Sequence, residues 1–303
     1  MKTSAIITIL CLLFLATPGC KEKPQATGPK YGASQQSGTA NMYRFAVHPL
    51  HNPAKLTQAY QPLIDYLNKR VKGAKFVLEA SRDYASFEVK YQDRAPELIL
   101  PNPWQTLQAM KTGYSVMATA GEPADFRGIL IVRKDGAIRK PSDLKGKAVS
   151  YPSHTALAAC VMPQYFLHTQ GININKDIEN RYVGSQESSI MNVFLQQTAA
   201  GATWPVPWRA FQKDRPDEAA QLKVVWETES LINNSVMIRN DIPDDVREQV
   251  RGLLTGLHES EDGKAILAAM AITRFLPASD KEYDVVRSYM ERFEREVRKV
   301  ATK

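Results

Sequence analysis

Short runs rich in β-branched and aromatic residues alternate with longer amphipathic stretches from Met42 to about residue 230. The run Tyr43–Val47 predicts a strand. The stretch Pro53–Val71 predicts a helix, with proline in its first turn and Leu56 and Leu63 on one face. Alternation of this kind is typical of strands that lie in a largely parallel sheet covered by helices. We therefore predict an α/β fold.

The alternation forms two series, which predict two lobes. The continuous apolar strand Gly128–Lys134 begins the second series, and a helix from about 155 to 168 follows it. Beyond Val236–Arg239 we expect only helices, the last of which begins with a capping box at Ser279. The predicted divisions are 42–127 for the first part of lobe one, 128–229 for lobe two and 230–303 for the return to lobe one, with hinge strands near 125–130 and 227–233.

The first residues predict export. The apolar run Ala5–Ala16 is too short to span a membrane, so residues 1–20 are typical of a signal peptide. The run ends in Leu15–Cys20, which resembles the lipobox of bacterial lipoproteins, although Thr17 stands where leucine is usual. We expect Cys20 to carry a lipid, and an ordinary cleaved signal is the alternative. Residues 21–41 are rich in Gly, Ser, Gln and Pro and predict a flexible tether.

Cysteine usage, charge and motifs exclude several classes of protein. Cys11 lies in the signal and Cys20 would be lipidated, so Cys160 has no disulfide partner in the mature chain. The formal net charge of +7 is spread along the chain without basic blocks, so we expect no nucleic-acid partner. The sequence holds no G-x-S-x-G, P-loop, H-E-x-x-H or G-x-G-x-x-G motif. We expect neither an enzyme nor a bound cofactor or metal.

Three predicted loops lead from a strand into a helix, where open parallel sheets bind their ligands. The loop 150–155 offers hydroxyls and an imidazole at a helix N-terminus, which suits a tetrahedral anion. The loop 100–105 offers amides and an indole N–H, and the loop 183–189 offers hydroxyl, amide and carboxylate groups. The candidate side chains are Tyr151, Ser153, His154 and Thr155 in the first loop, Asn102 and Trp104 in the second, and Ser185, Gln186 and Glu187 in the third.

Most of these candidates have a purely structural alternative. Thr155 could serve as an ordinary helix cap, and Trp104 could be a buried residue at the edge of the sheet. Glu187 in a first helical turn could simply compensate the helix dipole. His48 and His51 are close enough in sequence to suggest a metal pair, but nothing nearby completes a ligand set. We expect both histidines to be loop residues that face the cleft.

Several short motifs follow one another along the mature chain. They are Pro53, Leu56 and Tyr60 with Pro62–Leu67, Asp83–Tyr84, Pro101–Trp104 with Gly113–Tyr114, Ile131–Lys134, Asp143–Lys147, Ser153–Thr155, Gly184–Ser185 and Ile242–Pro243. In kind and order they resemble the phosphate/phosphite/phosphonate-binding family of periplasmic proteins of ABC transporters. No single motif is specific, and the resemblance rests on the order of all of them over nearly the whole mature chain. It implies a type II periplasmic binding protein fold, with two lobes joined by two hinge strands.

The resemblance also implies the roles of the candidate residues. In the family, a hydroxyl-rich loop of lobe two holds the oxyanion, which here falls on Ser153–Thr155. An aromatic residue of the Asn-Pro-aromatic loop contacts the ligand, and here it is Trp104, where tyrosine is more usual. The helix start at Ser185–Glu187 contributes polar contacts, and the loop with His48 and His51 lies over the cleft.

Two departures from the family pattern bear on the ligand. His154 interrupts what is often a run of Ser and Thr. In the loop 202–207, Pro205 stands where many relatives carry an acidic residue suited to an aminoalkyl group. An aminophosphonate is therefore disfavoured, and phosphate, phosphite or a different oxyanion is expected.

Together these features predict an exported, monomeric solute-binding protein that captures a small oxyanion by hinge closure. It would hand the anion to an ABC transporter permease from the periplasm or cell surface, where the lipid on Cys20 would hold it to the membrane. A sensor subunit that reports to a membrane kinase is the alternative with the same fold. An enzyme acting on a phosphorylated metabolite is the weaker alternative, for which Cys160 with a histidine is the only candidate pair.

Overall fold

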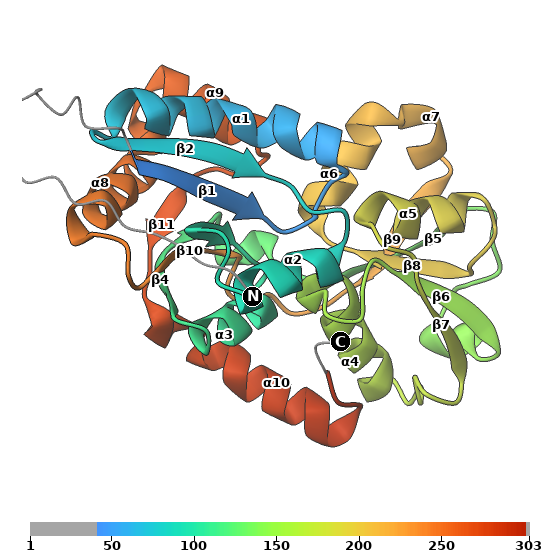
Figure 1. The fold of residues 1–303 in the computed structure, drawn as a ribbon. Coiled ribbons are helices and arrows are strands. Elements are labelled where there is room, and N and C mark those ends of the chain that lie inside the picture. The colour runs from blue at the N-terminus through green and yellow to red at the C-terminus, as the bar shows by residue number, and fades with distance from the viewer. Residues whose placement is uncertain (1–40, 301–303) are drawn as a thin grey trace, which may run out of the picture. The chain divides into compact units, whose positions relative to one another are not determined.

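Two sheets organise residues 41–300, the part of the chain that this computed structural model describes (Figure 1). The first sheet has the strand order β11-β4-β10-β3-β1-β2, and the second has the order β7-β6-β8-β5-β9. The first sheet consists of β1 (Asn41–Val47), β2 (Ala74–Glu79), β3 (Leu98–Leu100), β4 (Tyr114–Ala120), β10 (Ser235–Arg239) and β11 (Phe275–Pro277). The second consists of β5 (Ile129–Arg133), β6 (Lys147–Tyr151), β7 (Ile178–Tyr182), β8 (Ala200–Thr203) and β9 (Leu222–Glu227).

Helices flank both sheets, and we call each sheet with its helices a lobe. Lobe one holds α1 (Pro53–Arg70), α2 (Tyr84–Gln92), α3 (Pro103–Met110), α8 (Asp244–Thr255), α9 (Glu261–Ala269) and α10 (Asp284–Glu296). Lobe two holds α4 (Met162–Thr169), α5 (Gln186–Phe194), α6 (Pro205–Asp214) and α7 (Pro216–Ala219). A π-helical turn, η3 (Leu157–Val161), leads directly into α4. Figure 1 shows α1 beside α9, and α10 beside α3, where each pair also makes contacts.

In each sheet, the strand that arrives from the other lobe runs antiparallel to both of its neighbours. In the first sheet β1 pairs in parallel with β2 and β3, whereas β10 pairs antiparallel with both β3 and β4. In the second sheet β6 pairs in parallel with β7 and β8, whereas β5 pairs antiparallel with both β8 and β9. The chain therefore crosses between the lobes twice, and the predicted two-lobed α/β fold is confirmed.

The first sheet is buried on both faces, which explains its apolar strands. In β3, Leu98 and Leu100 belong to the core that α1, α8 and α9 cover, while Ile99 belongs to the core on the other face. Because successive side chains of a strand point to opposite faces, an unbroken apolar run is typical of a strand covered on both sides. This packing fixes the level at which the strands end, and so the positions of the loops that follow them.

Several helices of lobe one begin with caps that the sequence supplies. The Asn52 side chain accepts from the Lys55 backbone N–H at 3.0 Å, with Pro53 in the first turn of α1. Asn102 and Gln105 form a capping box at α3, with N–O distances of 3.0 and 3.1 Å. Such caps satisfy backbone N–H groups that have no intrahelical acceptor. These helices therefore start close to the ends of the strands that precede them. The predicted capping box at Ser279 is also present.

Two predictions for secondary structure were wrong. The chain beyond residue 239 is not purely helical, because β11 pairs with β4 at the edge of the first sheet. This strand has three residues and ends in Pro277. An edge strand tolerates proline, which lacks an N–H, because one side of the strand has no neighbour to accept a hydrogen bond. The segment 202–207 is not only a loop either, since Pro205 begins α6. Proline fits the first helical turn, where its missing N–H is not needed.

The two segments that join the lobes lie side by side. Thr228 donates its backbone N–H to the Gly128 carbonyl, and the Gly128 N–H donates to the Thr228 hydroxyl, both at 2.9 Å. Leu231 donates to the Phe126 carbonyl, also at 2.9 Å. The predicted segments near 125–130 and 227–233 therefore run next to each other where the chain passes between the sheets.

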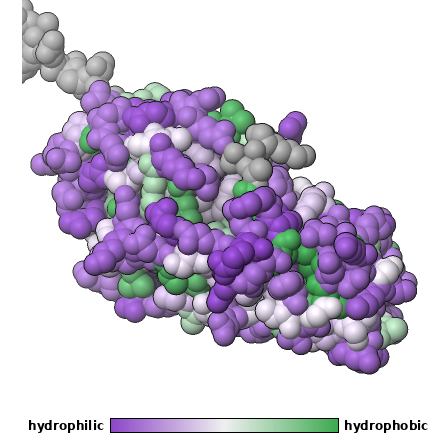
Figure 2. All heavy atoms as spheres, turned by 90° about the horizontal axis from the view of Figure 1, so that it is seen from below, coloured by the Kyte–Doolittle hydropathy of each residue, from purple (hydrophilic) through white to green (hydrophobic). Residues whose placement is uncertain are grey.

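Figure 2 shows one face of the described residues, coloured by hydropathy. Hydrophilic side chains dominate that face, and hydrophobic residues form separate small patches on it. Within residues 41–300, no helix is both long enough and apolar enough to cross a membrane.

Two glycines test the packing of the fold. In β8, a Cβ on Gly201 would lie 2.5 Å from the Ser189 carbonyl oxygen and 2.7 Å from a Val193 methyl group. We expect Gly201→Ala to destabilise the protein by about 1–3 kcal/mol in urea denaturation, because the neighbouring backbone must shift. Gly252→Ala on the exposed face of α8 meets no atom within 4 Å and should stabilise the protein by about 0.5–1 kcal/mol. Equal effects of the two substitutions would contradict the packing described for β8.

Candidate ligand-binding site

The carboxyl ends of parallel strands from both lobes meet at one cavity. His48 follows β1 and Asn102 follows β3, while Ala156 lies in the loop after β6 and Gln186 begins the helix that follows β7. Open α/β sheets bind ligands at such ends. The cavity is lined by His48, Tyr84 and Asn102 from lobe one, by Phe126 and Asn234 from the joining segments, and by Ala156, Leu157, Ala158, Ala159, Gln186 and Trp204 from lobe two.

The cavity is small and carries no charged side chain among its lining residues. Its free space has room for about one water molecule. A helix begins in its wall, where Ala156 precedes η3 and α4. The first N–H groups of a helix have no intrahelical acceptors, so this wall offers backbone donors and the positive end of a helix dipole.

His48 is held in one neutral tautomer. The side chain is 2% exposed, and its Nδ1 lies 2.9 Å from the Leu100 carbonyl oxygen. Because a carbonyl only accepts, Nδ1 carries the proton and donates it. Burial lowers the pKa of His48 to about 4, and the Leu100 hydrogen bond offsets part of that effect. At neutral pH the ring is therefore uncharged.

Thr155 joins the two lobes through the buried carboxyl of Glu88 on α2. The Thr155 hydroxyl donates to Glu88 Oε1 at 2.6 Å, and Gln105 Nε2 donates to the same oxygen at 3.1 Å. Asn102 Nδ2 donates to the Thr155 carbonyl oxygen at 3.2 Å. Burial raises the pKa of Glu88, while the hydrogen bonds from Thr155 and Gln105 lower it. These contacts therefore link α2 and α3 of lobe one to the loop after β6 of lobe two.

Gln186 makes a second connection between the lobes. Its Nε2 donates to the Tyr84 hydroxyl at 3.0 Å, and its Oε1 accepts from the Thr203 hydroxyl at 2.7 Å. Both side-chain polar atoms of Gln186 are therefore paired inside the closed structure. The connection fixes the orientation of Tyr84 at the cavity.

Other candidates of the predicted site lie behind the cavity. The Ser153 and Thr155 hydroxyl oxygens are 3.0 Å apart. His154 is half-buried, with its ring 5.9 Å from Tyr182 and its carbonyl oxygen accepting from Arg298 at 2.9 Å. Two further candidates are buried in the hydrophobic core, namely Tyr151 and Trp104. None of these residues is among those that line the cavity.

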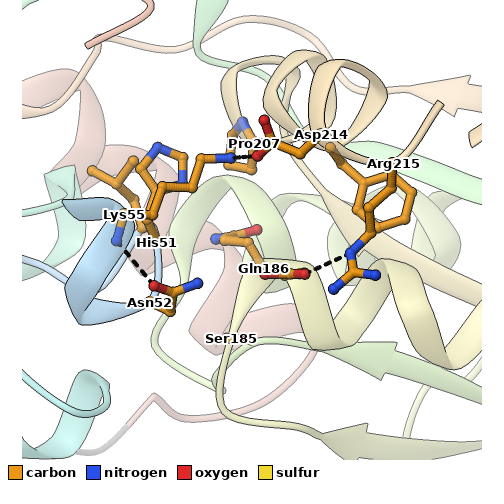
Figure 3. A pocket seen from close by; sticks show the side chains of 11 residues that line it. His51, Asn52, Lys55, Ser185, Gln186, Pro207, Asp214 and Arg215 are labelled. Carbon is orange, nitrogen blue, oxygen red and sulfur yellow. Dashed lines mark hydrogen bonds and ion pairs between the residues drawn. The ribbon is translucent and has the colours of Figure 1, made fainter. Parts of the chain in front are cut away.

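Ser185, Glu187 and His51 lie at a neighbouring pocket, which Figure 3 shows. There Lys55 of α1 pairs with Asp214 of α6, so an ion pair joins the lobes (Figure 3). Arg215 pairs with Glu187 at 2.9 Å within lobe two. Burial lowers the pKa of His51 to about 3, and the charge of Lys55 lowers it further. Gln186 lines both this pocket and the cavity, so the pocket lies beside the cavity.

Sequence reasoning missed Tyr84, Glu88 and Asn234. Tyr84 follows the cap residue Asp83 at the start of α2, so the rule that favoured the three loops would also have found it. Glu88 lies a turn further along the same helix. Asn234 belongs to the second joining segment, just before β10, and no local pattern marks it.

The described residues show no arrangement suited to metal binding or thiol chemistry. Residues 41–300 contain no group of three His, Cys, Asp or Glu side chains that could hold a metal. Burial raises the pKa of the Cys160 thiol to about 12, which keeps it protonated. Cys20 lies outside the described residues.

Comparisons with known proteins agree with this architecture. A sequence model described as the periplasmic substrate-binding protein of a phosphonate ABC transporter matches residues 45–283. The chain is 23% identical over 181 residues to a probable phosphite-binding protein of an ABC transporter from Prochlorococcus marinus. That alignment covers 55% of this chain and 61% of the relative.

Solved structures share the fold at low sequence identity. The binding component of an ABC phosphonate transporter from Pseudomonas aeruginosa has a TM-score of 0.78 and 15% identity, over 85% of this chain and 88% of that chain. A Prochlorococcus marinus protein in complex with methylphosphonate has a TM-score of 0.76 and 18% identity, over 84% and 99%. An alkanesulfonate-binding protein from Xanthomonas axonopodis has a TM-score of 0.61 and 14% identity, over 84% and 93%. With its matching sequence model and its two-lobed fold, this chain belongs to the family of periplasmic substrate-binding proteins of phosphonate ABC transporters.

Proposed function

We propose that this protein captures a small phosphorus oxyanion, such as phosphite or a short alkylphosphonate, and delivers it to an ABC transporter. The observation that carries the proposal is the small cavity between the lobes, with a helix start and neutral polar side chains in its wall. A tetrahedral anion needs several directed donors, which such a wall supplies, and the lobes would part slightly to admit it because the cavity has room for about one water. Phosphite and methylphosphonate are also the ligands named for similar proteins.

The cavity favours a ligand without an amine. No carboxylate is among its lining residues, and Trp204 and Phe126 occupy the wall near the start of α6, with ring centroids 5.7 Å apart. An ammonium group would have to leave water without an anionic partner in this wall, which is costly. The proposed ligand is therefore an oxyanion with a hydrogen atom or a short alkyl group on phosphorus.

The proposed mechanism is binding by closure of the lobes about the two joining segments. The anion would dock at the helix start of lobe two, and His48, Tyr84 and Asn102 of lobe one would then complete its surroundings. The bonds from Thr155 to Glu88 and from Gln186 to Tyr84 would form in the same step. No bond of the ligand is made or broken in this scheme. We further propose a periplasmic location, with a lipid on Cys20 as the anchor and a transporter permease as the partner.

Thermal unfolding in the presence of candidate ligands tests the proposed function. A ligand present at about a hundred times its dissociation constant stabilises the folded state by about 2.7 kcal/mol. We expect phosphite or methylphosphonate to raise the midpoint of unfolding, and aminoethylphosphonate to raise it less because its amine finds no carboxylate. If no phosphorus oxyanion changes the midpoint while an amino acid does, the proposed ligand class is wrong.

Thr155→Val tests the connection between the lobes. The substitution removes the hydroxyl that Glu88 accepts from, so the closed state would bury a carboxylate with one donor fewer. We expect the affinity for the ligand to fall about tenfold, as measured by calorimetry. Thr255→Val is the matched control, because the Thr255 hydroxyl bonds within the exposed face of α8. Unchanged affinity in folded Thr155→Val protein would show that this contact does not stabilise closure.

A further inference from the structure

Asn234 brings a side-chain amide with an unpaired oxygen to the cavity. Its side chain is 3% exposed and lines the cavity, and its Oδ1 is buried without a hydrogen-bond partner in residues 41–300. The backbone N–H of Asn234 donates to Asn233 Oδ1, and the backbone carbonyl oxygen of Asn234 accepts from the Ala120 N–H. Buried polar groups are normally paired, so this amide suggests a role toward a ligand. An amide offers both an acceptor and donors.

His48 supplies a second acceptor at the same place. Its Nδ1–H is committed to the Leu100 carbonyl, so its Nε2 can only accept. Within residues 41–300 the hydrogen bond shown for the His48 ring is the one from Nδ1 to Leu100. A ligand that approaches this nitrogen with a lone pair would be repelled, whereas a ligand that carries a proton would be bound.

Tyr84 supplies a donor beside these acceptors. Its hydroxyl oxygen already accepts from Gln186 Nε2, so its proton remains for the cavity. The backbone N–H groups at the helix start add further donors. The cavity is therefore complementary to a ligand that accepts several hydrogen bonds and also donates at least one.

We propose that the cavity selects the singly protonated form of its oxyanion, in which a P–OH group donates to His48 Nε2 or to the Asn234 amide. This inference rests on the proposed function and names the form of the ligand that is bound. A fully deprotonated phosphonate carries only lone pairs, and so does a sulfonate, which has no proton at neutral pH. Both would leave the acceptors of the cavity unpaired. A site built to accept from a ligand hydroxyl discriminates strongly against an analogue that lacks it.

The groups near His48 do not change this conclusion. Tyr84 and Glu88 lie on α2, which packs against His48, and Cys160 lies beyond Tyr84 in lobe two. None of these three groups can carry a positive charge, and burial raises the pKa of each, which favours its uncharged form. His51 lies in the same loop as His48 and is neutral, because burial lowers its pKa to about 3. The ligand and Glu88 are then the groups whose titration bears on binding, and two ligands of different acidity tell them apart.

Calorimetric titration of the protein with methylphosphonate between about pH 5.5 and about pH 8.5 tests the inference. A phosphoryl group loses its second proton near neutral pH, at about pH 6 for a phosphate monoester. Above the pH at which methylphosphonate loses its second proton, the dissociation constant of its complex should rise about tenfold for each pH unit, because only the protonated fraction binds. Difluoromethylphosphonate, which is more acidic, should show the same rise at a lower pH. A midpoint that stays at one pH for both ligands would belong to the protein and would overturn the inference.

Methanesulfonate and a histidine variant separate the possible failures. Methanesulfonate should bind at least about tenfold more weakly than methylphosphonate at acid pH. His48→Phe should weaken methylphosphonate binding there about tenfold and should strengthen methanesulfonate binding, because the unpaired acceptor is gone, while the control His168→Phe on α4 should alter neither. If phosphonate and sulfonate bind equally at every pH, the proposed function survives and this inference is wrong. If no phosphonate binds at any pH, both are wrong. Should His48→Phe not fold, the pH series with the native protein still decides.

Discussion

Polar groups that leave water when two lobes meet must find hydrogen-bond partners, and this constraint shapes the space between the two sheets. Thr155 pairs with Glu88, and Gln186 pairs with Tyr84 and Thr203. An unpaired buried group costs about 1–3 kcal/mol, so closure is favourable only when each group meets its partner. In the wall of the cavity, Asn234 Oδ1 is buried without such a partner, and the His48 ring bonds to Leu100 through Nδ1. A ligand that pairs with Asn234 Oδ1 and His48 Nε2 would stabilise the closed state.

The fold sets this constraint because packing fixes the strand ends and two adjacent segments join the lobes. The core on both faces of the first sheet fixes the strand ends from which His48 and Asn102 extend. The C-terminal helix also spans the lobes. It packs against α3, and its Tyr289 and Phe293 contact Tyr165 of α4 with ring centroids 5.6 and 6.4 Å apart. Rotation about the joining segments would therefore also move α4 along α10.

The sequence allowed the alternation of strands and helices, the caps and the loops at strand ends to be predicted, because these depend on local pattern. It did not reveal β11, which is too short for a periodicity, or the start of α6 at Pro205. Hydroxyls near a helix start suggested Ser153 and Thr155 as ligand contacts, but tertiary packing directs the Thr155 hydroxyl to Glu88. The importance of Asn234 depends on the absence of a partner in the fold, which no sequence pattern encodes.

The central claim is that the ligand binds in the cavity between the strand ends of the two lobes. A crystal structure with bound methylphosphonate tests it most directly. The account predicts phosphonate oxygens within about 3 Å of His48 Nε2, the Tyr84 hydroxyl and the Asn234 amide, at the helix start of lobe two. A phosphonate bound instead between Lys55 and Arg215 in the neighbouring pocket, with the cavity walls unchanged, would contradict it.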